Sequence, residues 1–370
     1  MGTTFWISSK DMDLEQKQAV EKVGQDISFL LKGPAGSGKS NILLLRAKWF
    51  TLKNCDNYKI ILFTSSLKDF FVEGSIQYGL NPENVITQIS FFKSILREYN
   101  VNFEYQDDFE TNRKLLADKV LELITKNQIS DEYLWAILVD EAQDYTATEI
   151  EIFRRLTKRL ILAADTRQNI YKNTLNVNEL EKYVEKTIEL KYHYRSGIQL
   201  CKVADAILDK ATYEKMEMDS QYAEDRMPSS VTKNELPNFE EQMNQIIDNI
   251  SSQLILYPEE KIGVLFPKRE QVELFNDCIQ HSKIKDKLEY IRVDTLHGGK
   301  GWEFRVVHIA GCEKLSRMGP IQKRLIYTGI LRGKTSASIY YTGYMPGYLS
   351  NALSIIEPPA SNPSIDELFF

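Results

Sequence analysis

The sequence GPAGSGKS at Gly33–Ser40 follows the apolar run ISFLLK and precedes the helical pattern SNILLLRAKWF. Glycines let several backbone amides converge on a phosphate, and the start of a helix adds a favourable dipole. A glycine-rich loop between a strand and a helix is the context that a phosphate loop requires. We expect Lys39 to neutralise the β- and γ-phosphates of ATP and the Ser40 hydroxyl to complete a Mg²⁺ shell. The loop comprises Gly33, Pro34, Ala35, Gly36, Ser37, Gly38, Lys39 and Ser40.

The stretch AILVDEAQD at 136–144 supplies an acidic partner for this loop. Asp140 and Glu141 end an apolar strand, which we expect to lie next to the strand before the loop. Parallel strands bring their carboxyl ends to one edge of a sheet, so both carboxylates would lie beside the phosphates. Asp140 then suits Mg²⁺ binding, and Glu141 suits the orientation of an attacking water.

Short apolar runs alternate with helical patterns along most of the 370 residues. This alternation predicts an α/β fold with mainly parallel sheets and helices on both faces. The expected strands are 27–31, 59–64, 135–140, 159–164, 186–190, 261–266, 288–293, 305–310 and 336–342. The stretch 211–240 has the weakest strand signal and is predicted to hold an irregular connection.

The length has room for two domains of ordinary size. We place the first domain at 1–185, with a small helical insert at about 100–131, and the second at 186–356. The remaining residues, 357–370, form a proline-rich tail.

Composition restricts the class of protein without naming a partner. The net charge of −6 does not indicate a polyanion partner, although nucleic-acid binding depends on local basic grooves. Four scattered cysteines predict reduced thiols rather than a zinc site or a disulfide framework. The sequence shows neither a secretory signal nor an apolar run of about 18 residues, so we expect a cytoplasmic protein without a membrane partner.

Nine segments together resemble the UvrD/Rep-like helicases of superfamily 1, from about Leu14 to Gly343. In family order they read DLEQKQAV, GPAGSGKS, ILFTSS, VITQISFF, DEAQD, AADTRQNIY, YHYRS, VDTLHGGKGWEF and RLIYTGILRGK. The resemblance implies two RecA-like lobes, ATP in the cleft between them, and ATP-driven 3′-to-5′ movement on single-stranded DNA.

The same resemblance implies roles for individual residues. Glu141 and Lys39 would be catalytic, with Gln168 as the γ-phosphate sensor and Arg195 and Arg332 as arginine fingers. Further nucleotide contacts would come from Gln16, Tyr194, Gly301 and Glu303, and nucleic-acid contacts from Phe63, Thr64, Thr295 and His297.

The chain departs from the family pattern in three respects. Asn173 stands where relatives carry a tryptophan that stacks on a base. Gly329 and Gly333 replace alanines, which predicts a looser helical support for Arg332 because glycine weakens helices. The spacing between segments leaves no room for large accessory inserts, so the strand-separating and regulatory surfaces are either missing or supplied by a protein partner.

Three functions remain open. The favoured one is a compact translocase or helicase on single-stranded DNA, a DNA-dependent ATPase of repair, mobile-element maintenance or phage defence. An RNA helicase is a second reading. A nucleotide-gated sensor of DNA ends or partner proteins, without processive unwinding, is the third.

Overall fold

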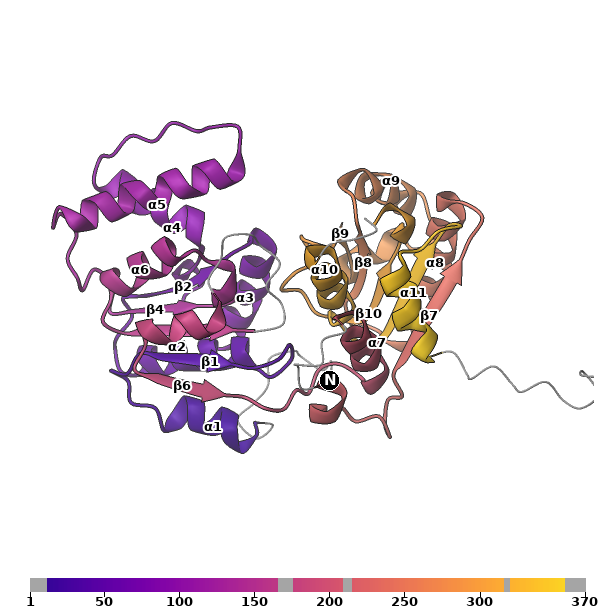
Figure 1. The fold of residues 1–370 in the computed structure, drawn as a ribbon, viewed down its shortest axis with the longest axis horizontal. Coiled ribbons are helices and arrows are strands. Elements are labelled where there is room, and N and C mark those ends of the chain that lie inside the picture. Colours follow the sequence, from indigo (N-terminus) through magenta and orange to yellow (C-terminus); the bar gives the residue numbers. More distant parts are fainter. Residues whose placement is uncertain (1–11, 166–175, 209–214, 316–319, 357–370) are drawn as a thin grey trace, which may run out of the picture. The chain divides into compact units, whose positions relative to one another are not determined.

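The fold is taken from a computed structural model, which describes residues 12–165, 176–208, 215–315 and 320–356 (Figure 1). The chain divides into two compact units. The first contains residues up to Tyr194 and also Lys300–Trp302, and the second contains Arg195–Gly299 and the residues from Glu303 onward.

The first unit is built on a six-stranded sheet in the order β3-β2-β4-β5-β1-β6, and each of its described pairings is parallel. The strands are β1 (Phe29–Lys32), β2 (Tyr58–Leu62), β3 (Val85–Thr87), β4 (Ala136–Val139), β5 (Leu160–Ala164) and β6 (Lys186–Glu189). The helices are α1 (Leu14–Glu21), α2 (Lys39–Leu52), α3 (Ser65–Gln77), α4 (Gln88–Glu98), α5 (Phe109–Thr125) and α6 (Ala147–Leu156). Short 3-10 turns lie at η2 (Pro82–Asn84), η3 (Ala142–Asp144) and η4 (Val177–Tyr183).

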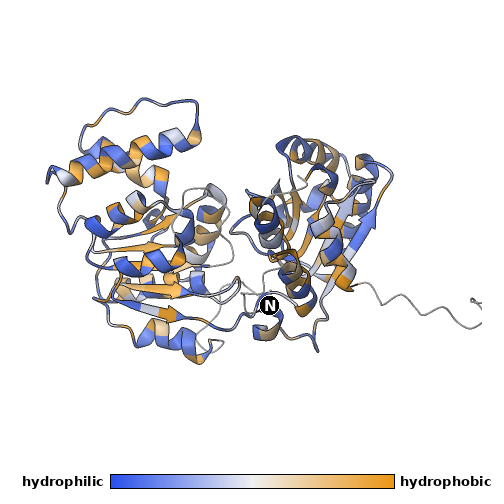
Figure 2. Cartoon of the chain, in the orientation of Figure 1, coloured by the Kyte–Doolittle hydropathy of each residue, from blue (hydrophilic) through white to orange (hydrophobic). Residues whose placement is uncertain are grey.

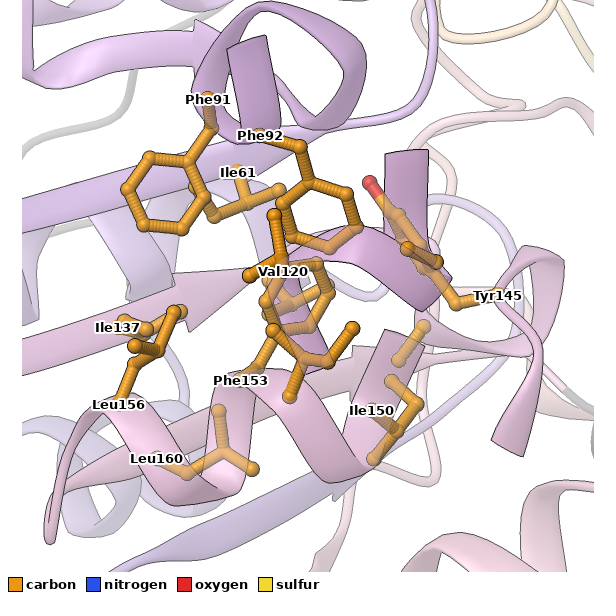
Figure 3. Close-up of a cluster of buried hydrophobic side chains, with 14 of the residues drawn as sticks. Ile61, Phe91, Phe92, Val120, Ile137, Tyr145, Ile150, Phe153, Leu156 and Leu160 are labelled. Atoms are coloured by element: carbon orange, nitrogen blue, oxygen red, sulfur yellow. The ribbon is translucent and has the colours of Figure 1, made fainter. Parts of the chain in front are cut away.

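Alternation along the central strands gives this sheet two apolar faces, because successive side chains point to opposite sides. Ile137 and Val139 of β4 pack with α4, α5 and α6, whereas Ala136 and Leu138 pack with α2 and α3. Figure 3 shows the first of these clusters, with the aromatic rings of α4 and α6 meeting over the sheet. Figure 2 shows the same pattern as apolar strands beneath helices with hydrophilic outer faces.

The second unit has a five-stranded sheet in the order β7-β11-β10-β8-β9, again with parallel pairings. The strands are β7 (Ser230–Glu235), β8 (Ile262–Phe266), β9 (Ile291–Thr295), β10 (Phe304–Ile309) and β11 (Gly333–Tyr341). The helices are α7 (Ile198–Leu208), α8 (Phe239–Leu256), α9 (Arg269–Gln280), α10 (Pro320–Ile330) and α11 (Gly347–Leu353). The 3-10 turns are η5 (Met216–Asp219), η6 (Lys285–Tyr290), η7 (Cys312–Lys314) and η8 (Ser354–Ile356). Helices α8 and α9 cover one face, and α7 packs against α10 and α11.

The predicted fold class, two mainly parallel α/β sheets with helices on both faces, is confirmed by these two units. The predicted boundary between the two domains, at 185/186, is wrong, because β6 pairs with β1 and so belongs to the first sheet. The division falls instead between Tyr194 and Arg195. The region 211–240 is also not wholly irregular, since it contains the edge strand β7.

The expected loosening by Gly329 and Gly333 is not what the structure shows. Gly333 opens strand β11, so a helix-propensity argument does not apply to it. A Cβ on Gly329 would lie 2.7 Å from Leu296 Cδ2, so this glycine lets α10 pack closely on its neighbours. Within the described ranges, no helix is both long enough and apolar enough to cross a bilayer.

Candidate nucleotide-binding site

The loop from Gly33 to Ser40 connects β1 to α2 and needs its glycines for steric reasons. Gly36 and Gly38 adopt the left-handed region, with φ of +78° and +86°, which disfavours side chains. A Cβ on Gly33 would lie 2.6 Å from Ser37 Oγ, and one on Gly38 would lie 2.6 Å from Gln16 Nε2. The loop is therefore tightly wound, and its conformation depends on residues without side chains.

Lys39 is the first residue of α2, and its side chain turns back over the loop. Its ammonium group donates hydrogen bonds to the carbonyl oxygens of Gly33 and Pro34, each at 2.8 Å. The positive charge is thus held at the centre of the loop, where a bound phosphate would replace neutral carbonyls with charged oxygens.

Ser40 and Asp140 meet although they come from distant segments. The Ser40 hydroxyl donates to Asp140 Oδ2 at 2.8 Å, which joins the phosphate loop to the end of β4. Burial, together with the charge of Glu141, raises the pKa of Asp140 to about 6. A cation placed here would stabilise the ionised carboxylate.

The expectation that β4 and β1 are neighbours is wrong, because β5 lies between them in the sheet. Asp140 still reaches Ser40, since the carboxyl ends of all three parallel strands lie at one edge. Gln143 links these ends by accepting a hydrogen bond from the backbone amide of Asp165, which follows β5.

Glu141 has a left-handed backbone with φ of +51°, which is uncommon for a residue with a side chain. Its Oε2 accepts a hydrogen bond from Gln143 Nε2. Such strain persists only where surrounding contacts enforce it, and it concentrates at functional positions. The contacts therefore fix the direction of this carboxylate beside Asp140.

A cation also reaches this acidic turn. Lys300 Nζ lies 2.5 Å from Asp144 Oδ2 and 4.0 Å from Glu141 Oε2, and both partners of the closer pair are buried. Burial raises the pKa of Asp144 to about 7, against the opposing charge of Lys300. Lys300 belongs to the first unit, although Gly299 and Glu303 on either side of its segment belong to the second.

Two of the predicted nucleotide contacts, Gln16 and Tyr194, lie along the loop. Gln16 donates from Nε2 to the carbonyl of Ser37 at 2.9 Å, and it forms a capping box with Asp13 at the start of α1. The Tyr194 hydroxyl donates to Asp13, and the Tyr194 amide donates to the carbonyl of Gly36. The structure therefore brings Gln16 and Tyr194 together at the phosphate loop.

The predicted residues of the second unit form their own contacts. Arg195 makes an ion pair with Glu303, a pairing that the sequence did not predict. The guanidinium of Arg332 donates to the carbonyl of Thr328 at 3.2 Å. Gly301, assigned by resemblance to the nucleotide, belongs to the first unit, where a Cβ would lie 2.5 Å from Leu67.

The residues predicted to contact nucleic acid differ in their burial and hydrogen bonding. Phe63 is half-buried after β2, and the Thr64 hydroxyl caps α3 by accepting from the amide of Leu67. Thr295 accepts from the amide of Gly298, and His297 is exposed. Gln168 and Asn173 lie outside the described residues.

The residues present fit a magnesium nucleotide. The described residues provide no hydrogen-bond partner for the buried Ser37 Oγ, which is therefore available to a ligand. Those residues also contain no group of three or more His, Cys, Asp or Glu side chains suited to a metal. Ser40 and Asp140 would hold a Mg²⁺, because this cation prefers oxygen ligands and these two side chains place oxygens side by side at the loop.

Sequence reasoning missed Gln143 and Asp144 as parts of this site, and it missed Arg113, which contacts Asp144 from α5 outside the site. Gln143 and Asp144 lay within the quoted DEAQD segment, but their partners are set by tertiary structure. Arg113 carried a weak signal, because it shares a helical face with the apolar Leu116 and Val120.

These features define an α/β fold with a phosphate loop beside an acidic strand end. No family model matches the chain, and no curated protein matches it. Among solved structures, the chain is similar to one described as the structure of PRRSV helicase, at 15% identity and a TM-score of 0.43. The similarity covers 89% of this chain and 54% of that one, so this chain spans about half the length of that structure.

Proposed function

We propose that the protein is an ATP-dependent translocase of the UvrD/Rep type, moving 3′ to 5′ along single-stranded DNA. The observation that carries the nucleotide part is the contact between Ser40 and Asp140. It unites a phosphate loop with an acidic strand end, as ATP hydrolysis with Mg²⁺ requires.

The chemistry follows from the placement of the groups in the first unit. Mg²⁺ bound by Ser40 and Asp140 would neutralise charge on the phosphates. Lys39 would exchange its two carbonyl partners for β- and γ-phosphate oxygens. Glu141, held by Gln143, would accept a hydrogen bond from the attacking water and orient it towards the γ-phosphate.

Residues of the second unit are proposed to complete the reaction. Arg195 and Arg332 would supply positive charge to the γ-phosphate in the transition state, an effect of roughly 10³- to 10⁵-fold in rate. Arg195 would then leave its ion pair with Glu303. Gln168 is proposed as the γ-phosphate sensor.

The nucleic-acid track is proposed to include Phe63, Thr64, Thr295 and His297. Stacking of a base on an aromatic ring contributes about 1–3 kcal/mol, so Phe63 would be the strongest of these contacts. Asn173, in place of a tryptophan, would lower the affinity for the strand.

A nucleotide-gated sensor within a larger assembly is the second candidate. It is favoured by the short insert between α4 and β4, in which α5 is the one helix. On either proposal we expect weak unwinding by the isolated chain, with accessory surfaces supplied by a protein partner.

Steady-state ATP turnover with single-stranded DNA, duplex DNA and RNA tests the proposal. We expect single-stranded DNA to raise kcat most, with an affinity that falls as salt rises. Glu141→Gln should bind ATP but lose turnover in every condition. A larger rise with RNA would favour an RNA helicase, and a basal rate that no nucleic acid changes would favour the sensor.

A further inference from the structure

Arg113 on α5 is a charged residue in an apolar position. Only 2% of its side chain is exposed, and it lies on the helical face that also buries Leu116, Ala117 and Val120. Helix α5 is the insert between α4 and β4, and it packs against α4 and α6 (Figure 1). Burying a guanidinium is unfavourable unless its donors are bonded, so its partners show what the position requires.

The first partner is Glu149 on α6, which Arg113 binds with two parallel hydrogen bonds of 2.6 and 2.5 Å. Glu149 in turn accepts a hydrogen bond from the amide of Thr146 at 2.8 Å and so completes the N-terminal cap of α6. The ion pair therefore fixes the start of α6, directly after the acidic turn.

The second partner is the acidic turn itself. Arg113 Nη2 donates to the carbonyl oxygen of Asp144 at 2.8 Å. The carboxylate of the same residue is bound by Lys300, and its amide donates to the carbonyl of Glu141 at 2.8 Å. Asp144 is thus held through its carbonyl, its carboxylate and its amide. The amide binds the carbonyl of Glu141, the residue proposed to orient water.

The third partner is Phe63. The guanidinium carbon of Arg113 lies 4.8 Å from the centroid of the Phe63 ring, within the range of a cation–π contact. The edge-on contact between Phe63 and Tyr145 has a centroid separation of 5.5 Å. These two contacts connect the Phe63 ring to the turn at residues 144 and 145: Arg113 binds the Asp144 carbonyl, and Tyr145 is the next residue of the chain.

We propose that Arg113 is a positioning residue that couples a nucleic-acid strand at Phe63 to the direction of the Glu141 carboxylate. This inference rests on the proposed function, because it takes Phe63 as a strand contact and Glu141 as the residue that orients water. A base that stacks on Phe63 shifts the ring, the guanidinium follows the ring, and the Asp144 carbonyl follows the guanidinium. Hydrolysis is then stimulated by the strand through α5.

The test compares Arg113→Lys with wild type and with Lys114→Met, an exposed cation on the same helix. Lysine keeps the charge for Glu149 but loses the planar fork that binds two partners and covers the ring. A second variant, Arg113→Met/Glu149→Met, removes both buried charges together and so keeps the helix face apolar. Urea denaturation establishes that each variant is folded before kcat, KM for ATP and oligonucleotide affinity are measured.

We expect strand stimulation of kcat to fall by about tenfold in both Arg113 variants, while basal kcat and KM for ATP stay within about threefold of wild type. Phe63→Leu should remove the same stimulation, and Phe63→Leu/Arg113→Lys should be no worse than either single variant. Full stimulation in the folded Arg113 variants, a parallel loss of basal and stimulated rates, or multiplicative losses in the double variant would overturn the inference. If wild type itself shows no strand stimulation, the proposed function fails before any Arg113 variant is needed.

Discussion

Ser40 and Asp140 are separated by 100 residues in sequence, and the hydroxyl of the first donates a 2.8 Å hydrogen bond to the carboxylate of the second. The contact brings the start of α2 to the end of β4 across the intervening strand β5. It places a hydroxyl oxygen and a carboxylate oxygen side by side at the glycine-rich loop, where the charge of Lys39 also acts on Asp140.

Lys39→Ala should lower the affinity for ATP by roughly 100-fold or more, because a hydrogen bond to a charged group contributes on the order of 1.5–3 kcal/mol and at least two are lost. Titration with a fluorescent ATP analogue measures this directly. Lys53→Ala, at an exposed position after α2, is the matched control and should bind like wild type. Equal affinities for Lys39→Ala and wild type would refute the nucleotide site.

Asp140→Asn should stabilise the nucleotide-free and metal-free protein at pH 8 but not at pH 4. Because the pKa of Asp140 is raised to about 6 in the folded state, from about 3.9 when unfolded, the folded protein keeps a proton that the unfolded chain releases. The free energy of unfolding therefore falls as pH rises from about 4 to 6. Above pH 6 it stays about 3 kcal/mol lower than it would be if the pKa of Asp140 were not raised. Asparagine does not titrate, so the variant does not lose this stability.

Urea denaturation of both proteins at the two pH values measures the difference. Asp131→Asn, at an exposed position, provides a control that should change little at either pH. A gain from Asp140→Asn that is the same at pH 4 and pH 8 would contradict the raised pKa.

Lys300→Met should destabilise the protein by about 3–5 kcal/mol, because it leaves the buried carboxylate of Asp144 without its cation. Lys300→Met/Asp144→Leu should recover most of that loss, since no buried charge remains. The exposed pair of Lys283 and Asp248 offers the comparison, and Lys283→Met should cost less than about 1 kcal/mol. The free energy of unfolding from urea titration separates these cases, and additive losses in the double variant would disprove the pairing.

Much of the geometry of the candidate site could be predicted from the sequence because its groups are local. A strand, a glycine-rich loop and a helix follow one another, so Lys39 and Ser40 are placed by their own segment. The acid at the end of β4 was predicted by its apolar strand. The position of β5 between β4 and β1 was not predicted, because the order of strands in a sheet depends on tertiary packing.

The two strands that the sequence did not predict, β3 and β7, have the weakest apolar patterns. β3 has three residues, and β7 is an edge strand in which Val231 is its one buried side chain. The boundary error has a similar origin, since nothing in residues 186–189 shows that β6 pairs with β1. The roles of Asp144 and Arg113 depend on partners distant in sequence, which a single sequence does not identify.

Arg332→Ala and Arg195→Ala should each lower kcat strongly, by roughly 10³-fold for an essential arginine finger, with modest effects on ATP affinity. Arg195→Ala also leaves Glu303 without its ion pair, so its folding must be checked by denaturation. Arg269→Ala, at an exposed position of the second unit, is the control. An unchanged kcat in either arginine variant would remove that residue from the proposed mechanism.

The most direct test of the translocase proposal is ATP-dependent displacement of streptavidin from biotin at one end of a single-stranded oligonucleotide. Movement from 3′ to 5′ predicts fast displacement from the 5′ end, slow displacement from the 3′ end, and neither with Glu141→Gln. ATP hydrolysis that single-stranded DNA stimulates, without displacement from either end, would contradict translocation and leave the nucleotide-gated sensor.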